Sequence, residues 1–187
     1  MFWVWTSVVI GVVLIVGWVI WSYNRFVEDK NYLIEAERGI DVQLKRRRNL
    51  VPPLVDVVKE YSEHEQTLLE SVTKARKKTD GASTLSGQAE VESILSVQVQ
   101  NVLGLAEDYP ELKADNSFQK LQDTLVEIED EIQYARRYYN GTVRNFNIRC
   151  NSFPNNIVAK LFGFTPKDYF VIRLTTEEDP PEVNMKS

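Results

Sequence analysis

The chain has 187 residues, with 22 Lys and Arg against 27 Asp and Glu, so its formal net charge is −5 and its pI about 5.1. This length suits one domain with appendages, and the acidic balance argues against nucleic acid as a partner. A single Cys and a single His exclude an intramolecular disulfide scaffold and a Cys/His zinc site. We therefore expect neither a cofactor nor a bound metal.

The first 24 residues carry no charged side chain, and residues 2–22 are almost all apolar. At about 1.5 Å per residue this segment forms a helix as long as the hydrocarbon core of a bilayer is thick. A cleaved signal peptide would need a basic start and a small-residue cleavage site, which this segment lacks. We expect residues 1–24 to be a retained transmembrane anchor with a very short outer N-terminus. Its membrane-interface residues are four tryptophans, two near each end: Trp3, Trp5, Trp18 and Trp21.

The orientation of the anchor follows from the basic residues near its ends. Arg25, Lys30 and Arg38 follow the apolar segment, and no Lys or Arg precedes it. Because basic residues favour the cytoplasmic side, this bias predicts a single-pass protein with its N-terminus outside and the bulk of the chain in the cytoplasm.

Beyond Arg25 apolar residues recur every three or four positions, which is typical of helices. No Pro precedes Pro52, so the anchor is expected to continue as one helix to Asn49, weakened only at Gly39. Pro52 and Pro53 are expected to end this helix. Its apolar stripe consists of Phe26, Leu33, Ile40, Leu44 and Val51.

Three further long helices are expected. The second covers residues 54–75 as a heptad seam that Glu65 interrupts, and the third covers 88–107. The fourth starts at an N-cap on Asn116 or Ser117 and runs to Pro154. The residues expected to face inward on the third and fourth helices are Val91, Ile94, Leu95, Val102, Leu105, Phe118, Leu121, Leu125, Ile128, Ile132, Ala135, Tyr139, Phe146 and Phe153.

A short apolar segment, 157–162, should stop at Gly163, and the acidic, Pro-containing tail at 174–187 is expected to be disordered. The predicted fold class is therefore all-α, with a single N-terminal transmembrane helix that continues into an antiparallel four-helix bundle of long helices. The predicted domains are the anchor at 1–24, the helical bundle at 25–173 and the tail at 174–187.

Glu65 is the candidate functional residue of the body, because an unpaired carboxylate inside an apolar seam is costly. It could be an acid for catalysis or proton sensing, or a structural polar residue in an interhelix ion pair. No nucleophile or second catalytic group accompanies it, which favours the structural interpretation. His64 has no second His for a helical metal site and is expected at the surface.

The basic run at residues 45–48 lies about 35 Å along a helix from the end of the anchor. Because the screening length is only about 8 Å at physiological salt, direct contact with anionic lipid is not expected. These cations suit the end of a helix, and one or two of them are expected to pair with acids of a neighbouring helix.

Several blocks of the chain, in the same order, resemble the LemA family. They are GIDVQLKRR at 39–47, NLVP at 49–52, YSEHE at 61–65, AEDYPELKA at 106–114, ARRYYN at 135–140, FPNN at 153–156 and KLFGF at 160–164. The resemblance implies a bacterial inner-membrane protein with one N-terminal transmembrane helix and an all-helical cytoplasmic body. A relative in magnetic bacteria takes part in forming the magnetosome membrane, which implies a membrane-organising role. The family brings no catalytic residues to transfer.

Three functions remain open at this point. The first is a non-enzymatic, membrane-anchored scaffold that organises membrane or protein assemblies by self-association. The second is a sensor or adaptor that relays an envelope signal to a partner protein, and the third is an enzyme that uses carboxylates such as Glu65. The expected partners are the lipid bilayer, further copies of the chain as a homo-oligomer, and other membrane proteins.

Overall fold

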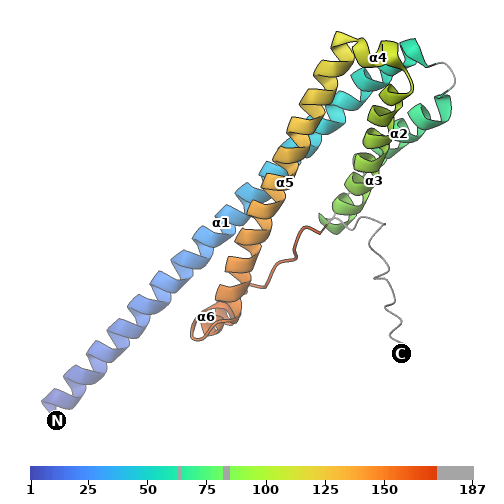
Figure 1. Cartoon of the computed structure of the whole chain (residues 1–187). Helices are drawn as coiled ribbons and strands as arrows, with labels where there is room; N and C mark the ends of the chain where they lie inside the picture. Colours follow the sequence, from blue (N-terminus) through green and yellow to red (C-terminus); the bar gives the residue numbers. More distant parts are fainter. Residues whose placement is uncertain (63–64, 82–84, 172–187) are drawn as a thin grey trace, which may run out of the picture. The chain divides into compact units, whose positions relative to one another are not determined.

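The computed structural model describes residues 1–62, 65–81 and 85–171 (Figure 1). In these ranges the chain is helical and contains no strand, so the all-α prediction is confirmed. His64 and the tail at 174–187 lie outside the described residues. The helices are α1 (Phe2–Tyr61), α2 (Gln66–Thr79), α3 (Leu85–Gly104), the short 3-10 helix η1 (Leu105–Glu107), α4 (Pro110–Ala114), α5 (Asn116–Asn151) and α6 (Asn155–Phe162).

The chain forms two compact units. Among the described residues, the first consists of residues 1–41 and 134–169, and the second of residues 42–133 together with Phe170 and Val171. Each unit therefore contains a part of α1 and a part of α5, whereas α2, α3 and α4 belong to the second unit and α6 to the first.

Helix α1 passes through Gly39 and, contrary to expectation, through Pro52 and Pro53. A proline at position 52 has no N–H to donate to the carbonyl of Arg48, four residues earlier. In the second unit Arg76 of α2 donates to this carbonyl from Nε at 3.2 Å. The prediction that Pro52 ends the helix is wrong, and a side chain from α2 provides a donor for the carbonyl that Pro52 leaves free.

The prediction of one helix at residues 54–75 is also wrong. The first part of this range belongs to α1, and α2 begins only at Gln66. Helix α3 starts earlier than expected and ends at Gly104, before η1. Of the residues expected inward on this helix, Leu95 and Val102 are buried but Ile94 is exposed. The apolar core of the second unit contains Val51, Leu54, Val58, Leu69, Val72, Leu95, Val99, Val102, Leu112, Phe118 and Leu125.

Helix α5 follows the expected seam closely, with Phe118, Leu125, Ile128, Ile132, Tyr139 and Phe146 all buried. Its capping residue differs from the expected Asn116 or Ser117. The Oδ1 atom of Asp115 accepts hydrogen bonds from the backbone N–H groups of Ser117 and Phe118, both at 2.8 Å, as an N-cap does. Phe153 was expected as the last seam residue, but it lies beyond the end of α5 and is 80% exposed.

Candidate functional site

The second unit contains a buried ion-pair network centred on Arg47 of α1, whose side chain is 2% exposed. Its Nη2 atom donates to Oε2 of Glu92 at 2.5 Å and to the backbone carbonyl of Glu92 at 3.0 Å. Its Nη1 atom donates to Oε2 of Glu129 at 3.0 Å and to the hydroxyl of Ser96. One guanidinium group therefore joins α1 to α3 and to α5 within this unit.

Glu92 of α3 is the fully buried carboxyl group of this network. Burial raises the pKa of Glu92, while the positive charges of Arg47 and Arg48 act in the opposite direction. The Nε atom of Arg48 lies 3.7 Å from Oε1 of Glu92. A cavity of about 180 Å³, lined in part by Arg47, Ser96 and Glu129, adjoins the network.

This arrangement is suited to holding helices in register. An arginine does not lose its proton at physiological pH, and both Glu92 and Glu129 accept hydrogen bonds from Arg47. A buried ion pair is retained in some proteins because it specifies one alignment of helices. Within the described ranges no group of three or more His, Cys, Asp or Glu side chains could hold a metal ion.

The sequence predicted part of this network. The expectation that one or two cations of residues 45–48 pair with acids of a neighbouring helix is confirmed for Arg47 and Arg48. The acid that receives them, Glu92, was missed. A signal for Arg47 was present, because it lies three residues after Leu44 and four before Val51 and therefore falls on the buried stripe of α1.

Glu65 occupies a different position from the one expected. It is the N-cap residue of α2, with φ −95° and ψ 26°, and is partly exposed. Its backbone carbonyl accepts the N–H of Leu69 at 3.1 Å. The helical seam expected to run through Glu65 from Tyr61 to Leu68 is therefore interrupted, since α1 has already ended. Its pairing with a basic residue stays a prediction.

The first unit presents the candidate membrane span. Among the described residues α1 is the one helix long and apolar enough to cross a membrane, and the apolar window within it has no buried residue. Trp3, Trp5 and Trp21 are exposed and Trp18 is partly exposed. This exposed, uncharged surface supports membrane anchoring through the N-terminal part of α1.

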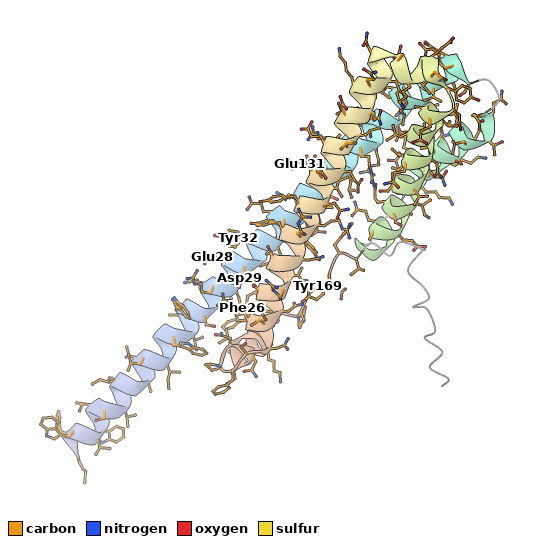
Figure 2. All side chains as sticks on the ribbon, in the orientation of Figure 1. Phe26, Glu28, Asp29, Tyr32, Glu131 and Tyr169 are labelled. Carbon is orange, nitrogen blue, oxygen red and sulfur yellow. The ribbon has the colours of Figure 1, made fainter. Side chains whose placement is uncertain are left out.

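Directly after the apolar span, other parts of the first unit make contacts with α1. The hydroxyl of Ser22 donates to Oδ1 of Asn155 at 3.0 Å. Phe26 packs edge-on against Phe146 with ring centroids 6.0 Å apart. One turn further, Asp29 pairs with Arg149 of α5 at 2.5 Å; Figure 2 labels Phe26 and Asp29 on α1. These contacts fix the start of the helical body where the charge-free segment ends.

These features define an all-helical, membrane-associated protein with an N-terminal apolar helix. A model of the LemA family matches residues 36–185, and the chain belongs to the LemA family. It is similar to the magnetosome proteins MamQ 1 and MamQ 2 of Paramagnetospirillum magneticum, each 23% identical over 87% of this chain and 69% of the relative. It is also similar to Protein LemA of Metamycoplasma hominis, with 28% identity over 73% of this chain and 63% of the relative. The resemblance to the LemA family seen in the sequence is thereby confirmed.

Proposed function

We propose that this protein is a membrane-anchored, non-enzymatic helical scaffold that organises membrane or protein assemblies by self-association. The observation that carries the proposal is the continuity of α1, which includes both an exposed apolar span and residues of the buried core. The basic residues that follow the span, beginning with Arg25, support an N-terminus outside and a body in the cytoplasm. Family membership supports placement in the bacterial inner membrane.

We further propose that the body is an antiparallel four-helix bundle. In the first unit Ser22 of α1 contacts Asn155 next to the end of α5. In the same unit Asp29, seven residues further along α1, pairs with Arg149, six residues before Asn155. As the residue numbers increase along α1, the numbers of the residues that it contacts decrease. This order supports antiparallel pairing of α1 and α5.

The absence of enzymatic activity is part of the proposal. The fully buried carboxyl of Glu92 accepts a hydrogen bond from Arg47, which favours a structural role over proton transfer. Relatives that match most of this chain are named as magnetosome proteins. Names that refer to a cellular assembly support an organising role for this chain more than chemistry on a small substrate.

The mass of the full chain in detergent, measured with and without residues 1–22, tests self-association. A scaffold gives particles of several times 21.6 kDa for the full chain. If the particles persist after truncation, the helical body carries the contacts. If only the full chain associates, the anchor carries them. A full chain that is monomeric at all concentrations would contradict the proposal.

A protease experiment tests the orientation. Tags on the two ends of the chain are compared in spheroplasts with an intact inner membrane. We expect the C-terminal tag to be protected until the membrane is opened. Digestion of this tag from the outside would show that the body is not cytoplasmic.

A second candidate function is a sensor or adaptor that relays an envelope signal to a partner protein. The continuity of α1 through Gly39 and Pro52 favours it, because an unbroken helix can transmit a rotation or shift. A monomeric chain that binds one defined partner in a fixed ratio would favour this function over the scaffold.

A further inference from the structure

Helix α6 (Asn155–Phe162) has an apolar surface that the described chain leaves uncovered. Ile157 and Leu161, one helical turn apart, are 56% and 72% exposed. Phe153, just before the helix, is also exposed. The opposite face of α6 is packed, since Val158 and Ala159 are buried. Neighbouring exposed apolar side chains of this size mark an interaction site.

The position of α6 within the first unit points to what covers this surface. Asn155 accepts a hydrogen bond from Ser22, the last residue of the apolar span. The ring of Phe162 lies 4.8 Å from the ring of Tyr23, centroid to centroid. Helix α6 is therefore held against α1 at the level where the span ends (Figure 1). This is the depth of the headgroups on the side where the body lies.

The far end of α6 is fixed as well. Gly163 adopts a left-handed conformation with φ 73°, and the N–H of Phe164 donates to the carbonyl of Ala159 at 2.9 Å. This C-cap turns the chain back toward α1. The ring of Phe164 then stacks on that of Phe26, with centroids 4.7 Å apart and an interplanar angle of 12°. Both ends of α6 are thus anchored, so the direction of its exposed face is set.

We infer that α6 is an interfacial membrane helix, whose side chains Phe153, Ile157 and Leu161 insert into the leaflet through which α1 leaves the bilayer. Its eight residues span about 12 Å, which is too short to cross a membrane but suits a helix lying in the interface. Lys160 is exposed between the two apolar positions, where a long cationic side chain can reach the phosphates. The inference rests on the proposed membrane anchoring.

The continuity of this surface with the apolar span favours the bilayer over a second copy of the chain as its occupant. Contacts at Ser22 and Tyr23 hold α6 beside residues already at the membrane surface. There, exposed Ile157 and Leu161 enter the lipid without any conformational change. An interfacial helix on one side of the membrane takes up area in one leaflet alone, which gives an organising protein a direct physical effect on the bilayer.

The test uses the full chain, reconstituted in vesicles of phosphatidylcholine and phosphatidylglycerol. An environment-sensitive fluorophore is attached to Ile157→Cys or Leu161→Cys in a Cys150→Ser background, since Cys150 is the native thiol. The matched control is Tyr134→Cys, an apolar position of α5 that is 63% exposed in the same unit. Flotation of the vesicles establishes that each variant is membrane-bound, and circular dichroism that each is helical.

We expect blue-shifted emission at positions 157 and 161, with loss of intensity when the vesicles contain nitroxide-labelled lipid, and neither effect at position 134. Chain that floats with the vesicles but shows the same unquenched emission at all three positions would overturn the inference and leave the anchor intact. Chain that does not float would overturn the proposed function itself. A blue shift that nitroxide lipid does not quench, and that grows with protein density, would overturn the inference in favour of a second copy.

Discussion

Replacing Arg47 by Ala should strongly destabilise the second unit. The substitution removes the donor to Glu92 and Glu129 and leaves Glu92 buried, with Arg48 at 3.7 Å as its remaining cation. Breaking a buried ion pair from one side costs about 3–5 kcal/mol. This cost has an upper limit, because Glu92 can take up a proton and become neutral in the variant. Taking up the proton costs about 1.4 kcal/mol for each pH unit by which the solution lies above the pKa of Glu92.

Two further variants separate charge from shape. Glu92→Gln keeps the shape of the side chain and removes its charge, so it should cost less than Arg47→Ala. The double variant Arg47→Met with Glu92→Leu replaces the pair by apolar side chains. Such replacements are often neutral or stabilise by about 1–4 kcal/mol. A double variant close to the wild type would mean that the pair specifies register and contributes little net stability.

The assay is urea unfolding of the full chain in detergent, followed by far-ultraviolet circular dichroism and analysed by linear extrapolation. A wild-type midpoint for Arg47→Ala would refute the burial of Arg47. A double variant as unstable as Arg47→Ala would show that lost packing, and not an unpaired charge, causes the effect.

The stability of the wild type and of Glu92→Gln should also depend on pH, and the direction of that dependence can be predicted. Burial raises the pKa of Glu92 above its ordinary value of 4.5, so between these two pKa values the folded state binds more protons than the unfolded state. The contribution of Glu92 to stability therefore falls as pH rises through this window. Glu92→Gln cannot lose a proton, and its stability relative to wild type should rise as the pH is raised from 4.5.

Arg76→Met should destabilise by about 1–2 kcal/mol, because the carbonyl that Pro52 leaves free loses its donor; Pro52→Ala restores a backbone donor and should reduce this loss in a double-mutant cycle. Gly163→Ala should cost about 1–2 kcal/mol, since φ is 73° there, and should speed hydrogen exchange of the amide that follows. Asp115→Ala should lower the unfolding midpoint and Asp115→Asn should not. The hydrogen bond from the Phe118 amide lowers the pKa of Asp115 below its ordinary value of 3.8. The stabilisation by Asp115 is therefore present above pH 3.8 and is lost as the pH falls through the lowered pKa.

The helical periodicity predicted most of the buried positions, because burial follows the face of a helix wherever the helix is regular. The five residues of the stripe from Phe26 to Val51 are buried. Of the eight seam residues from Phe118 to Phe146 six are buried, and Leu121 and Ala135 are partly exposed. The stop of α6 at Gly163 was also predicted. Each of these follows from local spacing or from the conformational freedom of glycine.

The helix ends that were predicted wrongly depend on contacts between residues distant in sequence. Pro52 has no N–H to donate within the helix, and the carbonyl that it leaves free accepts a hydrogen bond from Arg76 of α2. Glu92 is likewise missed by a single-helix pattern, since a buried carboxylate is tolerated only when a cation from another helix meets it. Neither partner can be identified from the spacing around the residue itself.

Polar contacts on α1 have a common physical role in the two units. A helix with an apolar stripe can slip by one heptad and still bury apolar side chains, so apolar packing alone specifies register weakly. In the second unit such a slip would remove Arg47 from Glu92. In the first unit it would separate Asp29 from Arg149. Each unit therefore fixes its own part of α1 by an ion pair. A fixed register of this long helix is what the proposed scaffold would require.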